Sequence, residues 1–258
     1  MSLNSLRAQM DFGLSQNFAF QVKQVDEFIE RFNGDKSTVL IEYMKKYYPE
    51  EQMERYELLT TLFDHEDKSW DMELIKDFLR DVNNPEKPRF LSYYDNDWYA
   101  QLDCMVEYRG EKQELSLFLE VESSPDLASE WVITGINADF LCLPELEDPR
   151  ESLNPVSHAT DFMNLHQLFE KPEYAQGYMH QGFRGDLLTL FYNALNRKEL
   201  RLKGIKNISY HFLQLPNWTF TLRRFRRLGL NSGWLIDSLT PMTEAEKANY
   251  RIQKLFLH

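Results

Sequence analysis

The chain of 258 residues is long enough for one large domain or two modest ones, and its 43% hydrophobic and 14% aromatic content supplies a sizeable core. The formal net charge of −12 opposes overall binding to nucleic acid and to anionic membrane surfaces. No apolar run approaches the roughly 18 residues that a membrane-spanning helix needs.

The distribution of charge and the two cysteines limit the kinds of partner and the cellular compartment that we expect. Residues 1–130 hold 14 Lys and Arg against 28 Asp and Glu, whereas residues 131–258 hold 15 against 13. The acidic half could dock on a basic partner, but such helices are usually solvated. Cys104 and Cys142 lie in apolar runs, which predicts buried free thiols, with one disulfide as the alternative. We expect a cytoplasmic protein, because the first residues lack the pattern of a secretory signal; a signal already removed is the alternative.

The first part of the chain predicts helices. Asn33-Gly34 is a stop signal for the first of them, and Ser37 is a candidate cap for the second. Together the helices form a layer that must pack on another surface. The predicted spans, from apolar residues at helical spacing, are 18–32, 39–47, 56–63 and 72–79.

An antiparallel meander is predicted next. Trp98–Tyr108 alternates, with Trp98, Leu102 and Cys104 on one face and Asp103 on the other. The turn Arg109-Gly110-Glu111 leads to a second strand that buries Leu115, Leu117, Leu119 and Val121 and shows Glu120 and Glu122 outward. A third strand opens at Trp131. Because a one-residue slip would invert every face, we expect these apolar residues to be much less exposed than the three acids.

The second half repeats this order. The charged stretch 144–155 predicts a boundary between domains 1–143 and 144–258. A capping-box pair, Thr243 and Glu246, opens a terminal helix. Before it, helices are expected over 162–169 and 187–195, and strands from residue 208 and over 218–225 and 234–239.

The two halves share one spacing. Trp131 follows Leu115 by 16 residues and opens Trp131-Val132-Ile133, and Trp234 follows Trp218 by 16 and opens Trp234-Leu235-Ile236. The spacing predicts a duplicated α+β unit, with helices packed on two antiparallel sheets or on one extended sheet, and each Trp strand beside the preceding one.

This order of helices followed by a meander resembles the NTF2-like (cystatin-like) α+β superfamily. The helix Phe28–Phe32, the hairpin Trp98–Val121 and the strand at Trp131 carry the resemblance, with an echo over Leu187–Leu195, Ile208–Leu222 and Trp234-Leu235-Ile236. It implies two related modules with curved sheets that wrap a helix, sometimes around a pocket. It implies no activity, because that fold hosts enzymes and binding modules alike. The echo departs from the pattern where four arginines interrupt its long strand.

Three carboxylates are candidates for chemistry. Asp103, Glu120 and Glu122 lie on the polar faces of paired strands, where neighbouring acids can raise one pKa or hold a divalent ion. Metal-dependent nucleases place acids similarly, but their pattern ends in Glu-x-Lys and here reads Glu120-Val121-Glu122. A solvated sheet face is therefore the favoured interpretation.

Other catalytic and cofactor motifs are missing from the sequence. There is no nucleophile elbow, Walker loop or dinucleotide-binding glycine motif. His158 and His166 could share a helix face, but zinc sites favour closer pairs with thiols or acids nearby. We therefore predict no catalytic residues, no cofactor and no metal.

A basic run stands out in this acidic chain. Arg223, Arg224, Arg226 and Arg227 surround Phe225, and arginines interleaved with an aromatic ring can bind phosphate or bases. The excess of carboxylates favours pairing within the chain or across a dimer. We expect at least two of these arginines to meet carboxylates.

Two functions remain open. The leading hypothesis is a non-enzymatic module that binds a protein partner or assembles with itself, because catalytic motifs are missing and aromatics are abundant. The alternative is a small-molecule binder or enzyme, whose cavity would contain Asp103 and be lined by Trp98, Tyr99, Tyr108 or Trp131. Neither hypothesis involves nucleic acid or a membrane.

Overall fold

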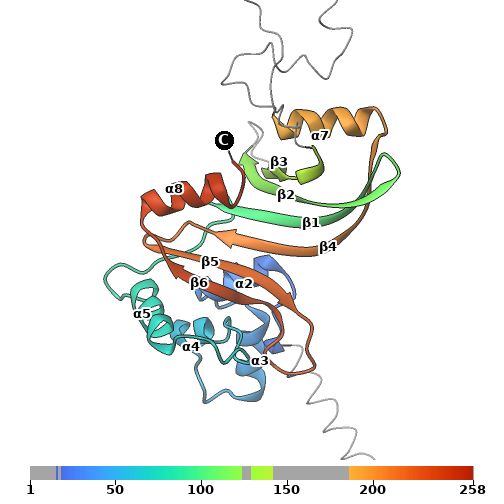
Figure 1. Ribbon diagram of the computed structural model, residues 1–258. Helices are drawn as coiled ribbons and strands as arrows, with labels where there is room; N and C mark the ends of the chain where they lie inside the picture. Colours follow the sequence, from blue (N-terminus) through green and yellow to red (C-terminus); the bar gives the residue numbers. More distant parts are fainter. Residues whose placement is uncertain (1–15, 17–18, 124–128, 142–185, 258) are drawn as a thin grey trace, which may run out of the picture.

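Six runs of alternating side chains pair into one antiparallel sheet, which helices cover on both faces (Figure 1). The computed structural model describes residue 16 and residues 19–123, 129–141 and 186–257. Within them the chain is an α+β protein. Its helices are α2 Val25–Asn33, α3 Val39–Tyr47, α4 Arg55–Thr60, α5 Met72–Val82, the 3-10 turn η1 Asp139–Leu141, α7 Leu187–Asn196 and α8 Glu244–Gln253. Its strands are β1 Trp98–Tyr108, β2 Glu111–Ser123, β3 Ser129–Asn137, β4 Leu200–Phe212, β5 Trp218–Phe225 and β6 Gly233–Pro241.

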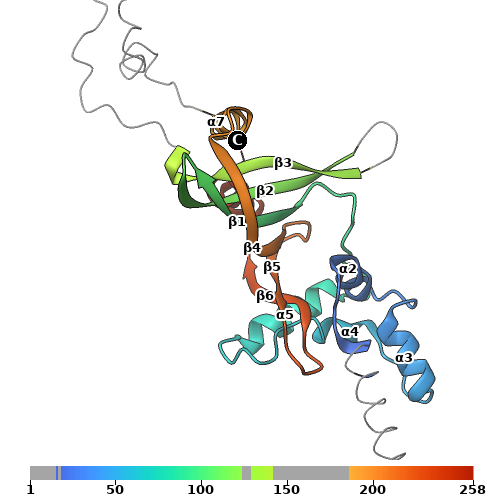
Figure 2. The same ribbon diagram turned by 90° about the vertical axis from the view of Figure 1, so that its right-hand side faces the viewer.

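The sheet has the strand order β3-β2-β1-β4-β5-β6. Each tryptophan strand lies beside the preceding strand as predicted, β3 against β2 and β6 against β5. β1 pairs with β4 from Trp98 opposite Phe212 to Tyr108 opposite Leu200, so strands from both predicted modules share one sheet. The sheet is strongly twisted (Figure 2). The predicted boundary at residues 143 and 144 and the predicted helix over 162–169 lie outside the described residues. The NTF2-like, two-module arrangement stays a prediction.

Local signals explain where three of the helices begin or end. Gly34 ends α2 in the left-handed conformation, at φ 75°, as its stop signal predicts. Thr38, rather than Ser37, caps α3 by accepting a hydrogen bond from the Ile41 amide. Thr243 and Glu246 form the predicted capping box of α8. β4 begins at Leu200, well before the predicted start at Ile208.

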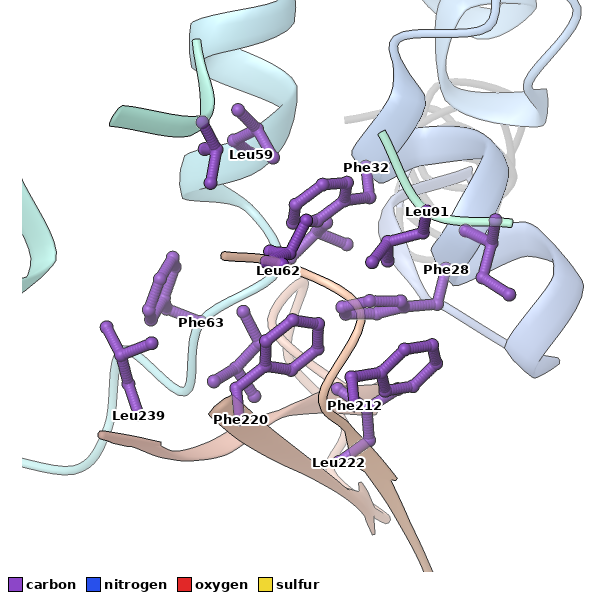
Figure 3. Packing of buried hydrophobic residues seen from close by; sticks show 14 of the residues in the cluster. Phe28, Phe32, Leu59, Leu62, Phe63, Leu91, Phe212, Phe220, Leu222 and Leu239 are labelled. Carbon is purple, nitrogen blue, oxygen red and sulfur yellow. The ribbon is translucent and has the colours of Figure 1, made fainter. Parts of the chain in front are cut away.

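The largest core lies between the N-terminal helices and the half of the sheet formed by β4, β5 and β6 (Figure 3). Phe212 of β4 and Phe220 of β5 stack with ring centroids 5.0 Å apart. Phe28 of α2 lies 6.0 Å from both rings. Aromatic rings thus fill the space between helices and sheet, because Phe212 and Phe220 stand directly opposite each other on β4 and β5 and Phe28 of α2 packs on both.

The central strands are covered on both faces. Cys104, Leu115 and Leu117 pack beneath α7, whereas Tyr99 and Phe118, on the opposite face, pack against Leu255. This second layer corrects the expectation that the polar face is solvated. Of the three acids on that face, only Glu122 is exposed, while Asp103 and Glu120 are half-buried; Leu102 and Leu119 are half-buried too, at the margin of the α7 cluster.

The two sheet edges differ. The outer edge of β6 is occupied by the chain itself, through isolated parallel bridges to Val22 and Phe63. The Val22 amide donates to Ser232 O and the Ile236 amide to Leu62 O. β3 is the opposite edge strand, and no pairing is present on its outer side within the described part of the chain.

Candidate functional site

An apolar strip crosses the sheet between its two packed halves. Leu102 and Leu119 flank the α7 cluster, and Ile208 and Tyr210 flank the cluster under α2–α5. All four are half-buried. Trp131 and Ile133 of β3 continue the strip to the sheet edge, where their exposed fractions are 40% and 43%. We call these six residues the apolar strip: Leu102, Leu119, Trp131, Ile133, Ile208 and Tyr210.

Ring contacts fix the position of Trp131. Its ring meets that of the buried Trp98 edge-on at 4.6 Å and lies 6.2 Å from that of Tyr210. Trp98 itself is a core residue that stacks on Phe212 at 5.3 Å. Of the two predicted site tryptophans, Trp131 is therefore the one that a partner can reach.

Acidic residues line the opposite face of the same edge. Glu122 of β2 pairs directly with Glu130 of β3, and both are exposed. Burial, with the nearby charge of Glu122, raises the pKa of Glu120. Like charges directly opposite each other on a sheet are destabilising, so a cation bound here would relieve repulsion.

A polar network connects α8 to the sheet. Tyr250 Oη lies 2.7 Å from His211 Nδ1, and His211 Nε2 lies 3.1 Å from Gln101 Oε1. Gln101 Nε2 donates to Asp103 Oδ1 at 2.7 Å. Ser116 Oγ also donates to Asp103, at 2.8 Å. These contacts fit one neutral tautomer of His211, in which Nδ1 accepts a hydrogen bond from the Tyr250 hydroxyl and Nε2 donates one to Gln101 Oε1.

The network shifts the titration of its members. Burial lowers the pKa of His211 to about 4 and raises the pKa of Tyr250 to about 12. Burial alone would raise the pKa of Asp103, but hydrogen bonds from Gln101, Ser116 and Asn207 outweigh it and lower that pKa. A carboxylate with a lowered pKa is a weak general base, so the geometry favours a structural role for Asp103.

A cavity of about 350 Å³ opens beside this network. Asp103 lines it, but the four aromatic residues expected around Asp103 do not: Trp98 and Tyr99 are buried in core clusters, and Tyr108 packs on Phe140. Lys206, the extra residue in a bulge of β4, reaches Glu114 of β2 at 2.5 Å. The lining residues are Asp103, Cys104, Glu114, Leu115, Ser116, Asn137, Asp139, Lys206 and Asn207.

The arginine run meets carboxylates within the chain, as predicted. Arg223 lies 2.7 Å from Asp237, and Arg227 binds both carboxylate oxygens of Asp64, at 2.5 and 2.8 Å. The hydrogen bonds from Arg227 lower the pKa of Asp64. Arg224 and Arg226 are exposed and form no ion pair with any residue that the structure describes.

The two arginine pairs should contribute unequally to stability. Asp64 is 7% exposed and would be left buried without its cation, so Arg227→Met is expected to cost about 1–3 kcal/mol of unfolding free energy. The matched Arg223→Met removes a pair whose side chains are 51% and 25% exposed and should cost less than about 1 kcal/mol. Urea titrations of both variants check this, and equal losses would contradict it.

Of the two cysteines and the histidine pair considered above, the structure describes only Cys104. Cys104 is a buried free thiol, and burial raises its pKa. Cys142, His158 and His166 lie outside the described residues. Among the residues that are described, no three His, Cys, Asp or Glu side chains group so as to hold a metal, and none of the helices is long and apolar enough to cross a membrane.

Comparison of the chain with protein-family models, with curated proteins and with solved structures gives no match.

Proposed function

We propose that this protein is a non-enzymatic protein-binding module that receives an extended segment of a partner protein along β3. The observation that carries the proposal is the contrast between the two sheet edges. The chain covers the outer edge of β6 with its own residues near Val22 and Phe63. β3 has no such cover in the described ranges, and it presents Trp131 and Ile133 at the end of the apolar strip. Natural sheets usually protect an edge of this kind unless it pairs with another chain.

Strand addition would use both the backbone and the side chains of β3. Main-chain hydrogen bonds supply affinity, and alternate side chains of the added strand supply specificity. One face of the added strand would extend the apolar strip beyond Ile133. Trp131, held against Trp98, would act as the aromatic anchor typical of interface hot spots.

The face of β3 opposite to Trp131 predicts the charge of the partner segment. Glu122 and Glu130 lie side by side there and repel each other. The partner segment should therefore alternate apolar residues with Lys or Arg. This pattern also agrees with the acidic first half of the chain, which favours association with basic segments.

The small-molecule alternative has weaker support. The cavity beside Asp103 has a lining that is polar apart from Cys104 and Leu115, whereas ligand pockets are predominantly apolar and aromatic. The half-buried Asp103 already accepts three hydrogen bonds and has a lowered pKa, so it is poorly suited to take a proton from a substrate.

A peptide selection tests the proposal. Panning a random peptide library against the full chain should enrich segments that alternate apolar and basic residues. Ile133→Asp should weaken the binding of a selected peptide by at least about tenfold, because a carboxylate would face the apolar side of that peptide. Titration calorimetry measures this change.

The matched control is Ile252→Asp on α8, which introduces the same charge at a side chain that is 55% exposed. It should leave peptide affinity unchanged. Equal weakening by both variants, or enriched peptides without alternation, would contradict strand addition at β3.

A further inference from the structure

β4 has an open edge of its own inside the sheet. β4 runs from Leu200 to Phe212, but β5 pairs only with the part from Ser209 to Phe212. Residues 200–208 pair with β1 on one side, and no described strand pairs with their other side. Figure 2 shows this part of β4 continuing past β5 towards α7. We call the unpaired side of residues 200–208 the β4 edge.

The β4 edge alternates apolar and basic side chains. Leu202 and Ile205 are 52% and 49% exposed. Their partners on β1 belong to the cluster beneath α7, so both point to the face that carries the apolar strip. Arg201, Lys203 and Lys206 alternate with them in the sequence and are also exposed. This order of apolar and basic residues is the one that β3 is expected to select in a partner.

The lysines of the β4 edge lie on the face opposite to the apolar strip. Lys203 lies 2.9 Å from Glu107 and Lys206 lies 2.5 Å from Glu114, and both acids are on that face. All four side chains are partly exposed. An ammonium group has three donors, so each lysine can also meet a carboxylate of an added strand. Lysines at an edge disfavour a second basic strand but accept an acidic one.

β3 and the β4 edge are complementary as an antiparallel pair. If Trp131 of β3 lies opposite Ile205, Glu130 lies opposite Lys206, because the two strands run in opposite directions. Apolar side chains then meet on one face and opposite charges on the other, and both kinds of cross-strand pair are favourable. The lengths agree too, since β3 has nine residues and β4 has 13, of which four pair with β5.

The two edges cannot meet within one molecule, because β2 and β1 separate β3 from β4 in the sheet. Two β3 strands would bring glutamates together, and two β4 edges would bring cations together, so pairing of like edges is disfavoured. We infer that the segment received along β3 is the β4 edge of a second copy, so that one sheet continues from copy to copy. This inference rests on the proposed function and names a partner for the same site. The contact is heterologous, so it builds chains or closed rings of copies.

Variants of the two edges test the assembly. Sedimentation velocity of the full chain over a concentration series should show an average mass that rises with concentration. Ile205→Asp and Ile133→Asp should each weaken association by about tenfold or more, because each brings a carboxylate between the apolar side chains of the contact. These side chains are 49% and 43% exposed in one copy, so both variants should melt close to the wild type. Ile252→Asp, on α8, is the matched control and should assemble like the wild type.

Mixing the two variants is the decisive measurement. Ile205→Asp keeps an intact β3 and Ile133→Asp keeps an intact β4 edge, so their mixture should form dimers with one copy of each variant. Neither variant should form dimers alone. A mixture without dimers, a wild type that stays monomeric, or assembly that Ile205→Asp leaves unchanged would overturn the inference.

A selected peptide separates this inference from the proposed function. Ile205→Asp leaves β3 unchanged, so in titration calorimetry it should bind a peptide selected against the full chain, and excess peptide should dissociate wild-type assemblies. Assemblies that persist in saturating peptide would place the contact away from β3 and would also overturn the inference. A monomeric wild type whose peptide binding is weakened by Ile133→Asp would contradict only the inference. Peptide binding that Ile133→Asp leaves unchanged would contradict the proposed function itself.

Discussion

Gly233→Ala is expected to lower the free energy of unfolding by about 3 kcal/mol or more, a large fraction of the stability of an ordinary domain. Gly233 has φ 95°, a conformation that costs any residue with a Cβ atom. A Cβ atom built there would also lie 1.9 Å from Val22 O, far inside van der Waals contact. Both the conformation and the contact therefore require glycine.

The collision would break the bridge that covers the β6 edge. The Val22 amide donates to Ser232 O at 3.1 Å, and the Trp234 amide donates to Val22 O at 2.8 Å. Val22 is fully buried in the main core, so moving it away also opens that core. The loss thus combines backbone strain, two hydrogen bonds and apolar contacts.

A glycine series separates these contributions. Gly110→Ala, at φ 89° with no atom within 4 Å of the new Cβ, isolates the conformational cost and should lose about 1 kcal/mol. Gly229→Ala, where the new Cβ also meets no atom within 4 Å, should stay within about 0.5 kcal/mol of wild type. Guanidinium titrations should rank the losses as Gly229, Gly110 and then Gly233. A Gly233 loss no larger than that of Gly110 would contradict the close contact with Val22.

The strands were predictable because their signal is local. The alternation of apolar and polar residues over Trp98–Tyr108 shows directly which side chains share a face of the strand. The 16-residue spacing predicts that each tryptophan strand lies beside the preceding strand, as it does in the sheet. The burial of Asp103 and Glu120 was not predictable in this way. It depends on residues more than 100 positions away: Asn207 of β4 donates to Asp103, and Leu255, after α8, packs on Tyr99, the strand partner of Glu120.

The contacts of the candidate site also include some that the sequence predicts and some that it does not. Internal pairing of Arg223 and Arg227 follows from composition, because carboxylates outnumber cations in the chain. The polar network does not follow from composition. Gln101 and His211 approach each other through the pairing of β1 with β4, and Tyr250 reaches His211 because α8 packs on the sheet. No local spacing marks these three residues as neighbours.

His211 is expected to make the protein less stable as the pH falls from about 6.5 towards 4. Burial lowers the pKa of the folded histidine to about 4, below the ordinary value of 6.5. The unfolded chain therefore binds the proton more readily than the folded chain does. The contribution to stability is complete above pH 6.5 and is lost progressively as His211 in the unfolded chain becomes protonated, about 3 kcal/mol in all.

The charged groups around His211 are consistent with a lowered pKa and hence with a loss of stability at low pH. Lys254 lowers the pKa further, whereas the carboxylate of Asp103 opposes the shift without cancelling it. The lowered pKa of Asp103 gives a similar loss of stability, but in a lower pH range, because unfolded aspartate titrates near pH 4. Burial raises the pKa values of Glu30 and Glu120, whose effect on stability has the opposite sign, so a variant without the imidazole is needed to separate the contribution of His211.

The comparison of wild type with His211→Gln isolates the effect. Glutamine keeps hydrogen-bonding groups near Tyr250 and Gln101 but does not titrate, so the variant should show a flatter dependence of unfolding free energy on pH. The exposed His65→Gln, which makes the same substitution outside the network, is the matched control. Urea titrations at constant ionic strength measure all three proteins. Parallel curves of unfolding free energy against pH for wild type and His211→Gln would mean that His211 titrates alike in the folded and unfolded chains. That result would contradict the assignment of a buried, neutral histidine between α8 and the sheet.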